Sequence, residues 1–512
     1  MTTRAWWCLA LGVLAVCGWF AYLAVYQVDD AYIVYRYARN LAHGEGFAFN
    51  PGERVEGVTC FLWTLALVPF AAAGLPLPLV APILTALAGL GVVLLLPRVS
   101  ARLSGRDRPD AWAAAGSALL ASHPAFAYWS VGGLETVPYT LLVVLALHDQ
   151  LREQARGYGR RSAIWIGLAT LVRPEAPLIA AGLAAGRACD GPGRRLRDRL
   201  RDQVLWWGLL GAFLVPFLIF RRLYFGAWLP NTYYAKTGFG LMQSLHDGRV
   251  YTLAFLSSLA PGFGSAGPVT VFIGVGIALA VVSFGLPLAG LRSAALLVCA
   301  LGLAVLLEGG DWMVLNRFWV PGLPAIILLL VAAGRVVATQ RPRLRPCLAV
   351  CGIIFAASFV TSGVIQRDGP NGLAVNGAGY RFAHRQVAEF LKARARPGDT
   401  VALMDIGIIG YQTGLRIIDI SGLTEPAIAM APGGFLHKRY PAAALLKASP
   451  RFFVLVNGFP IDEEIMGRAD FAERYRLVLE RNHRFNWEPR QSYTLHVYER
   501  RDSEATPAPR SR

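Results

Sequence analysis

The sequence predicts a polytopic α-helical membrane protein with about eleven spans and a small C-terminal extracytoplasmic α/β domain. Three observations lead to this fold class. Hydrophobic residues make up 55% of the 512 residues, and the mean hydropathy is +0.43, whereas soluble domains are about half apolar and about a quarter charged. Apolar stretches of roughly bilayer length alternate with short basic stretches. After residue 366 this alternation stops, and shorter strand-like segments follow.

The basic excess of the chain is a topology signal. The sequence has 50 Lys and Arg against 33 Asp and Glu, and the basic residues cluster between apolar stretches at 98–108, 152–161, 187–201 and 335–345. Cytoplasmic loops carry such clusters, whereas nucleic-acid binding needs one basic patch. We therefore predict no nucleic-acid partner. We expect a multi-pass inner-membrane protein, surrounded by membrane lipid, with a cytoplasmic N-terminus.

The spans follow from apolar length and from keeping the basic loops inside. The first, about 5–26, has bilayer length and lacks a small-residue cleavage site, so we predict an uncleaved helix. Residues 60–73 are short for a crossing and predict an interfacial or re-entrant helix. Residues 162–186 are interrupted around Pro174 and Pro177 and predict two half-spans. The other predicted spans are 79–96, 111–129, 136–150, 204–221, 268–290, 293–308, 318–338 and 346–366, with an external loop at 222–267.

These spans divide the chain into three predicted parts. Residues 1–366 form the membrane domain with a first external loop at 27–77, residues 367–500 form the extracytoplasmic α/β domain, and residues 501–512 form a disordered tail. Within the α/β domain, the pattern predicts a helix at 382–395 and strands at 400–404, 416–420, 452–456 and 493–498.

Six polar motifs interrupt the apolar pattern, and the predicted topology places all of them on the extracytoplasmic face. Ionisable residues at the edge of a membrane are costly and mark functional sites. The motifs are Asp29–Arg36, Asn50–Gly57, Gly132–Thr136, Arg173–Glu175, Leu229–Lys236, and Gly309–Trp312 with Arg317. We therefore expect one site on that face, built from separate parts of the chain.

Asp29 and Asp30 are the candidate catalytic residues. They directly follow the first span, and a positioned carboxylate can take a proton from a hydroxyl while a neighbouring acid orients the substrate or raises the pKa of its partner. The alternative is structural, because Asp30 can cap the helix expected at 31–43. Asp405 follows the strand predicted at 400–404 and Asp419 lies near the end of the one at 416–420, and each either contributes to binding or belongs to a turn.

The candidate substrate-binding residues are four cations, three acids and one amide. The cations, which can receive a lipid phosphate, are Arg36, Arg173, Lys236 and Arg317. The acids and the amide are Glu135, Glu175, Asp311 and Asn231. The structural alternatives are an ion pair between Arg173 and Glu175, snorkelling of Lys236 and Arg317, and loop-end roles for Glu135 and Asp311. We predict no metal site, because paired His or Cys spacing is missing from the sequence, and we predict no cofactor.

Six segments, taken in order, carry a family resemblance. They are DDAYIVYRYARNLAHGEGFAFNPGERVEGVTCFLW, GGLET, VRPE, LPNTYYAK, GGDWMVLNRFWVPGLP and DIGIIGYQTGLRIIDISGL. As a set they resemble the family of the mycobacterial terminal β-(1→2)-arabinofuranosyltransferase and its bacterial relatives. The resemblance implies the glycosyltransferase C fold, a polyprenyl-phosphate sugar donor, a catalytic acid in the first external loop, here Asp29 or Asp30, and a periplasmic C-terminal domain that assists acceptor binding. The segment VEGVTCFLW departs from the family by lacking an Asn near Cys60, which leaves the donor sugar and the acceptor open.

Residues and resemblance together predict a metal-independent glycosyltransferase. It would move a sugar, arabinofuranose by resemblance, from a polyprenyl-phosphate donor to a cell-envelope glycan, lipid or protein acceptor. The alternative is a transporter or flippase for lipid-linked sugars, which also needs intramembrane charges and broken helices. A flippase should place its charges at both membrane faces, whereas these motifs favour one face.

Overall fold

The chain forms two compact units, each built from separate stretches of sequence. The computed structural model describes residues 3–25, 27–156, 159–189, 196–238, 240–259, 290–369, 372–483 and 493–501. We call residues 1–24, 79–219 and 241–365 the bundle unit, and residues 25–78, 220–240 and 366–512 the sheet unit. The contacts thus group residues 25–78, which include the predicted first external loop, with the C-terminal residues. The division at residue 366 stays a prediction.

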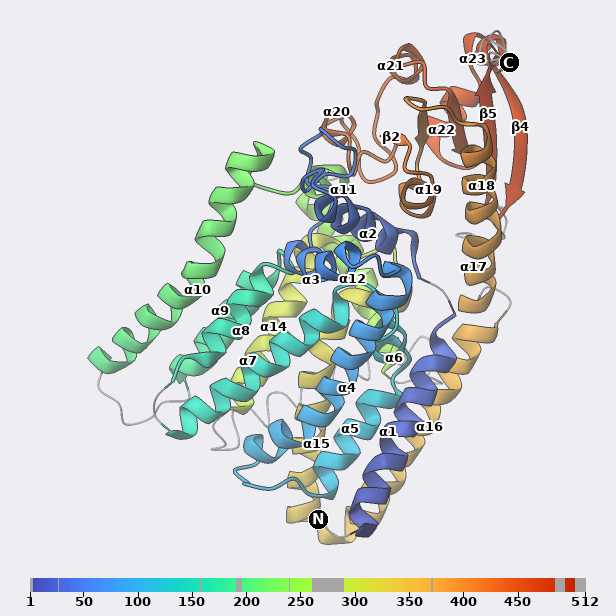
Figure 1. The fold of residues 1–512 in the computed structure, drawn as a ribbon. Helices are drawn as coiled ribbons and strands as arrows, with labels where there is room; N and C mark the ends of the chain where they lie inside the picture. The colour runs from blue at the N-terminus through green and yellow to red at the C-terminus, as the bar shows by residue number, and fades with distance from the viewer. Residues whose placement is uncertain are drawn as a thin grey trace. The chain divides into compact units, whose positions relative to one another are not determined.

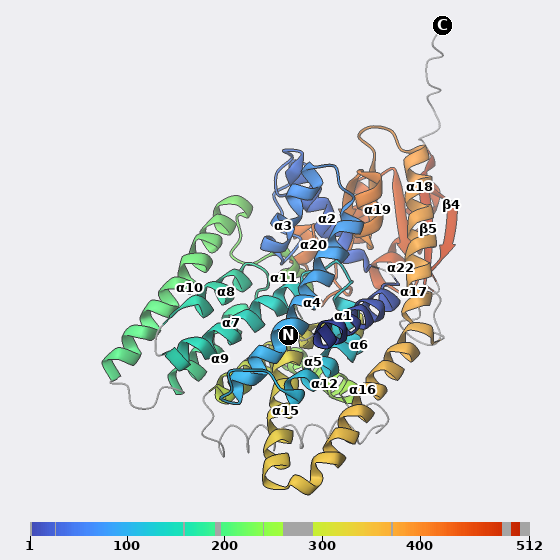
Figure 2. The same ribbon diagram turned by 60° about the horizontal axis from the view of Figure 1, so that its bottom comes forward.

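The bundle unit consists of helices, and neighbouring pairs include α7 with α8, α9 with α14, and α5 with α15 (Figure 1). In the second view, α1 lies beside α5 and α6 (Figure 2). The helices that lie wholly or mainly in this unit are α1 (Thr3–Leu23), α4 (Leu77–Leu103), α5 (Ala111–Ser122), α6 (Pro124–Trp129), α7 (Thr136–Arg156), α8 (Arg161–Thr170), α9 (Ala176–Cys189), α10 (Leu196–Phe225), α12 (Leu241–Ser258), α14 (Leu291–Glu308), η2 (Val314–Gly322), α15 (Leu323–Gln340), η3 (Pro342–Leu344) and α16 (Arg345–Asp368).

Several of these helices are long and apolar enough to cross a bilayer, which confirms the helical membrane-protein class. Among the described residues, the stretches that meet both criteria are Leu77–Leu103, Arg197–Phe225, Leu291–Glu308, Val314–Gln340 and one that contains α16 (Arg345–Asp368). The total of about eleven spans stays a prediction, and the predicted span at 268–290 lies outside the described residues except for Gly290, as does the tail from residue 502.

Two local predictions can be compared with the helix bounds directly. Helix α8 ends at Thr170 and α9 begins at Ala176, so the interruption falls at the expected Arg-Pro-Glu segment, where proline cannot continue the helical hydrogen bonds. The predicted external loop at 222–267 contains α12, an 18-residue helix that packs on α14, and its place outside the membrane stays a prediction. Its polar residues, such as His246 and Asp247, weakened the apolar signal from which helices were predicted.

The sheet unit contains a five-stranded mixed sheet in the order β2-β1-β3-β5-β4. The strands are β1 (Thr400–Leu403), β2 (Arg416–Asp419), β3 (Phe452–Val456), β4 (Tyr475–Asn482) and β5 (Thr494–Arg500). Strands β1, β2 and β3 are parallel, whereas β5 runs antiparallel to β3 and β4. The helices are α2 (Asp29–Ala42), α3 (Phe61–Ala72), α11 (Asn231–Lys236), α17 (Leu373–Gly379), η4 (Tyr380–His384), α18 (Arg385–Arg394), α19 (Ile406–Thr413), α20 (Pro426–Ala429), α21 (Ala442–Lys447), α22 (Pro460–Met466) and α23 (Ala469–Arg474).

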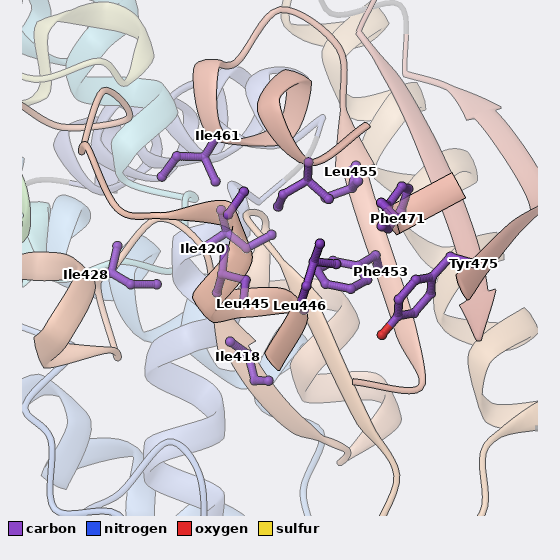
Figure 3. Close-up of a cluster of buried hydrophobic side chains, with 13 residues drawn as sticks. Ile418, Ile420, Ile428, Leu445, Leu446, Phe453, Leu455, Ile461, Phe471 and Tyr475 are labelled. Atoms are coloured by element: carbon purple, nitrogen blue, oxygen red, sulfur yellow. The ribbon is translucent and has the colours of Figure 1, made fainter. Parts of the chain in front are cut away.

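The core of the sheet unit packs against the central strands. Every residue of β3 is buried, as expected for a parallel strand covered on both faces. Ile418 and Phe453 lie in one cluster with Leu445, Leu446 and Phe471 from the helices beside the sheet (Figure 3). This cluster fixes β1 and β2 and therefore the loops that leave their carboxyl ends.

The carboxyl end of β1 is the place where the sheet connections diverge. From β1 the chain passes through α19 to β2 on one side, and β3 pairs with β1 on the other side. In open α/β sheets such a switch point opens a crevice at the strand ends. Asp405 lies there, directly before α19.

Candidate functional site

Asp29 joins the start of α2 to the start of α19, which lies beside α2 in the sheet unit (Figure 1). The buried carboxylate of Asp29 accepts hydrogen bonds from the backbone N–H groups of Gly407 and Ile408, both at 2.7 Å. These N–H groups belong to the first turn of α19, where a helix has no partners of its own. Asp29 therefore caps a helix that follows it by more than 370 residues.

The predicted alternative for Asp30, a cap of its own helix, is wrong. Helix α2 begins at Asp29, and its N-cap residue is Val28, which makes no side-chain capping bond. Asp30 therefore lies in the first helical turn, where the helix dipole stabilises a negative charge. Its side chain is half-buried, whereas Asp29 is buried, so the two neighbouring acids differ in their access to solvent.

The environment of Asp29 brings the pKa of its carboxyl group close to neutral pH. Burial, and then the negative charge of Asp405, raise the pKa of Asp29 to about 7. The backbone hydrogen bonds from α19 act in the opposite direction, because they stabilise the ionised form. Asp29 can therefore exchange a proton near pH 7, as a general base must.

Asp405 is held on its other side by two buried side chains. The Nε2 atom of His384 lies 2.7 Å from Oδ2 of Asp405, and the hydroxyl of Tyr493 donates to the same oxygen at 2.5 Å. Burial alone would raise the pKa of Asp405, but these two contacts outweigh it, so the pKa lies below its ordinary value. His384 and Tyr493 were missed in the sequence, since neither lies in a polar motif; the segment DIGIIG was the only signal nearby.

Arg36 contributes to the structure of the site instead of presenting a free cation. Its Nε donates to the carbonyl of Phe49 at 2.7 Å, its Nη1 to Gly410 at 2.8 Å and its Nη2 to Leu415 at 2.7 Å. The guanidinium is also buried over the Phe49 ring. A phosphate would have to displace these carbonyls, so the contacts favour a structural role over the predicted anion-binding role.

The motif at 229–236 meets the loop after β2. The side-chain amide of Asn231 donates to the carbonyls of Gly422 and Leu423 at 2.8 and 2.9 Å. Asp419 holds the same loop by accepting backbone N–H bonds from Ser421 and Thr424. These contacts favour the turn role for Asp419 and a positioning role for Asn231.

Lys236 differs from the other three predicted cations. Its ammonium lies 5.3 Å from the centre of the Phe435 ring, and it forms no ion pair with any described residue. The neighbouring Lys438 is instead buried and donates to the carbonyls of Tyr234 and Thr237. Lys236 is therefore the predicted cation in the sheet unit that is available to an anion.

In the bundle unit, Arg173 lies between two predicted acids. Its Nη1 contacts Glu135 at 3.0 Å, its Nε contacts Glu175 at 2.9 Å, and its guanidinium covers the Phe318 ring at 4.6 Å. All three charged side chains are buried. The predicted ion pair between Arg173 and Glu175 is thus present, with Glu135 as a second partner.

Arg317 and Asp311 form a second ion pair in the bundle unit, at 2.7 Å. Arg317 also lies over the rings of Trp129 and Phe318. The two residues before it, Leu315 and Asn316, have φ values of 62° and 48°, a left-handed conformation that is uncommon for residues other than glycine. The backbone therefore turns sharply just before Arg317, whose guanidinium packs on Trp129 and Phe318.

The structure brings the six motifs together in two groups of three. The motifs at 29–36, 50–57 and 229–236 meet in the sheet unit, and those at 132–136, 173–175 and 309–317 lie in the bundle unit. The convergence of all six stays a prediction. Across the described ranges, no group of three or more His, Cys, Asp and Glu side chains is placed to hold a metal ion.

The resemblance predicted from the motifs is confirmed by comparison with known proteins. The chain is 31% identical over 263 residues to the terminal β-(1→2)-arabinofuranosyltransferase of Mycobacterium tuberculosis, a match that covers 49% of this chain and 40% of the relative. The match thus spans less than half the length of that relative. Residues 373–498 match a family described as a domain of unknown function (DUF8728).

Two solved structures match this chain with TM-scores below 0.5. The oligosaccharyltransferase of Archaeoglobus fulgidus matches with a TM-score of 0.47 and 13% identity, over 80% of this chain and 62% of that chain. The arabinofuranosyltransferase AftD from mycobacteria matches with a TM-score of 0.36 and 14% identity, over 81% of this chain and 34% of that chain.

Proposed function

We propose that the chain is a membrane glycosyltransferase of the glycosyltransferase C fold that uses a polyprenyl-phosphate sugar donor. It transfers the sugar to a cell-envelope acceptor on the extracytoplasmic face of the inner membrane. The observation that supports this most strongly is the buried carboxylate of Asp29, whose pKa is raised to about 7 by burial and by Asp405, in a chain similar to an arabinofuranosyltransferase.

Asp29 acts as the general base in this proposal. It takes the proton of an acceptor hydroxyl while that oxygen forms a bond to the anomeric carbon of the sugar. The bond from the anomeric carbon to the phosphate oxygen breaks, and polyprenyl phosphate leaves with the electron pair. A carboxylate offers about four lone-pair positions, and two are used by the N–H groups of α19, so Asp29 retains capacity for the proton. The half-buried Asp30 orients the sugar hydroxyls.

Lys236 is the proposed contact for the donor phosphate. It belongs to the same compact unit as Asp29 and forms no ion pair with the described residues, whereas Arg173 and Arg317 are neutralised by acids. A flexible ammonium binds phosphate as a point charge. We therefore place Arg173, Glu135, Glu175, Asp311 and Arg317 in a supporting network, and arabinofuranose as the proposed sugar rests on the name of the relative.

The proposal is tested by sugar transfer from a lipid-linked donor in reconstituted membranes. We expect Asp29→Asn to reduce the rate by about 10²- to 10⁴-fold, the range for loss of a general base, and Asp30→Asn to reduce it less. The control is Glu473→Gln, an exposed acid of α23, which should transfer at the wild-type rate. Full activity in both Asp29→Asn and Asp30→Asn contradicts the mechanism, and wild-type protein that moves the lipid-linked sugar across the bilayer without transfer supports the flippase instead.

A further inference from the structure

Two carboxylates meet at the N-terminus of α19, and the structure gives them different partners. Asp29 arrives from α2 and accepts two backbone N–H bonds from α19. Asp405 is the residue directly before α19, but its side chain makes no capping bond to that helix. It points instead to His384 and Tyr493. The same helix end therefore holds one acid by the backbone and the other by side chains.

The partners of Asp405 are themselves fixed in the interior. The side chain of His384 is fully buried, and its Nδ1 lies 3.1 Å from Nδ1 of His483. The ring of Tyr380 packs against both histidines, with ring centres 4.9 and 4.5 Å away. A Cβ atom at Gly379 would lie within 2.5 Å of the His483 side chain. His384 therefore has little freedom to turn away from Asp405.

Two neighbouring buried carboxyl groups cannot both ionise easily, because their negative charges repel each other. Hydrogen bonds from His384 and Tyr493 stabilise the charged form of Asp405, because both groups can donate to a carboxylate oxygen. The negative charge of Asp405 then disfavours a second charge on Asp29. The two neighbouring acids consequently divide their roles, as paired acids do when their environments differ.

We infer that Asp405 is a positioning residue for Asp29: His384 and Tyr493 hold Asp405 as a fixed anion, and its charge leaves the exchangeable proton of the pair on Asp29. The division of the proton does not depend on the reaction, whereas the use of that proton in catalysis rests on the proposed function. The raised pKa of Asp29 and the lowered pKa of Asp405 agree with this division.

Other titratable groups face the pair and must be separated from it. They are Tyr32 from α2, Arg385 from α18, Asp462 from α22, and His384, His483 and Tyr493. Burial also raises the pKa of Asp462 to about 7, so a signal near neutral pH must be assigned by mutation.

The inference is tested by pH-difference infrared spectroscopy of the full-length protein in lipid nanodiscs. A protonated buried carboxyl gives a C=O band, and we assign to Asp29 the part that Asp29→Asn removes. We expect Asp405→Asn to move the midpoint of that band to lower pH by about one unit, because a like charge is removed. We expect His384→Phe, which preserves ring packing but removes the donor, to add a second C=O band, because Asp405 is then no longer held as an anion and takes up a proton.

The second band excludes a merely structural effect, since general loosening would not give a C=O band that the further change Asp405→Asn removes. Asp399→Asn is the matched control, because Asp399 pairs with Arg451 at 2.6 Å in the same unit and should leave the midpoint unchanged. An unchanged or raised midpoint in Asp405→Asn contradicts the inference, and so does a His384→Phe protein that shows no C=O band from Asp405.

The two hypotheses fail in different ways. Wild-type protein that shows the assigned band but no sugar transfer contradicts the proposed function and supports the division of the proton. If the wild-type protein transfers the sugar but Asp405→Asn leaves the midpoint of the Asp29 band unchanged, the inference is contradicted and the proposed function is not. In active protein, the acidic limb of the pH–rate profile should follow the band to lower pH in Asp405→Asn.

Discussion

Gly407 is the residue that allows α2 and α19 to approach each other. A Cβ atom at this position would lie 1.9 Å from the backbone carbonyl oxygen of Asp29, far inside van der Waals contact. Only glycine lets the first turn of α19 reach the Asp29 carboxylate without moving the backbone of α2. Asp29, the proposed base, therefore keeps its position only because Gly407 has no side chain.

Gly407→Ala is expected to separate the two helices at this contact. Because the added methyl meets backbone, which cannot rotate away, the free energy of unfolding should fall by about 1–3 kcal/mol, and transfer activity should fall with it. Thermal unfolding in detergent and the transfer assay measure the two effects. Gly208→Ala is the control, since a Cβ at Gly208 meets nothing within 4 Å. Equal stability and activity in both variants would show that the helices do not approach so closely.

At the scale of elements, the interrupted helix pair α8 and α9 carries charge into an apolar bundle. Arg173 lies in the break and is buried between Glu135 and Glu175. Removing one partner from a buried ion cluster leaves uncompensated charge, which is more costly than the cluster is stabilising. The break is therefore held by complementary charges as well as by proline.

Arg173→Gln is expected to lower the free energy of unfolding by about 3 kcal/mol, because two buried carboxylates lose their cation. Unfolding of the reconstituted protein in denaturant measures this loss. Neutralising the acids as well, in Arg173→Gln with Glu135→Gln and Glu175→Gln, should restore part of it. Arg152→Gln is the matched control, since Arg152 is partly exposed and lies 3.8 Å from Asp149. An Arg173→Gln protein as stable as this control would show that the charges of Arg173, Glu135 and Glu175 do not stabilise the break.

At the scale of the whole molecule, the sequence predicted local features better than distant contacts. The break at 171–175 follows from its prolines, and β3 coincides with the predicted 452–456. Strand β4 was missed because Arg476, Glu480 and Arg481 interrupt its alternation at the exposed edge of the sheet. The contact of Asp29 with Gly407 joins residues 378 positions apart, and a pairing at that separation leaves no periodic signature.

The same limit explains which parts of the candidate site were predicted. Asp29 and Asp30 could be found because charge directly after an apolar span is conspicuous, and Lys236 because it lies in one of the six polar motifs. The partners of Arg36 are backbone carbonyls of Phe49, Gly410 and Leu415, which no side-chain pattern reveals. His384 lies in a helical segment with no metal-ligand or catalytic spacing, so its contact with Asp405 appears only in the folded chain.

The pH dependence of single-turnover sugar transfer by the wild-type protein tests the central claim most directly. Because burial and Asp405 raise the pKa of Asp29 to about 7, a base that must be ionised loses activity as the pH falls through that value. The rate should be constant above about pH 8 and should fall about tenfold for each unit below pH 7. Asp29→Asn should remove this acidic limb together with most of the activity. A rate that is independent of pH between 5 and 8 would contradict Asp29 as the base.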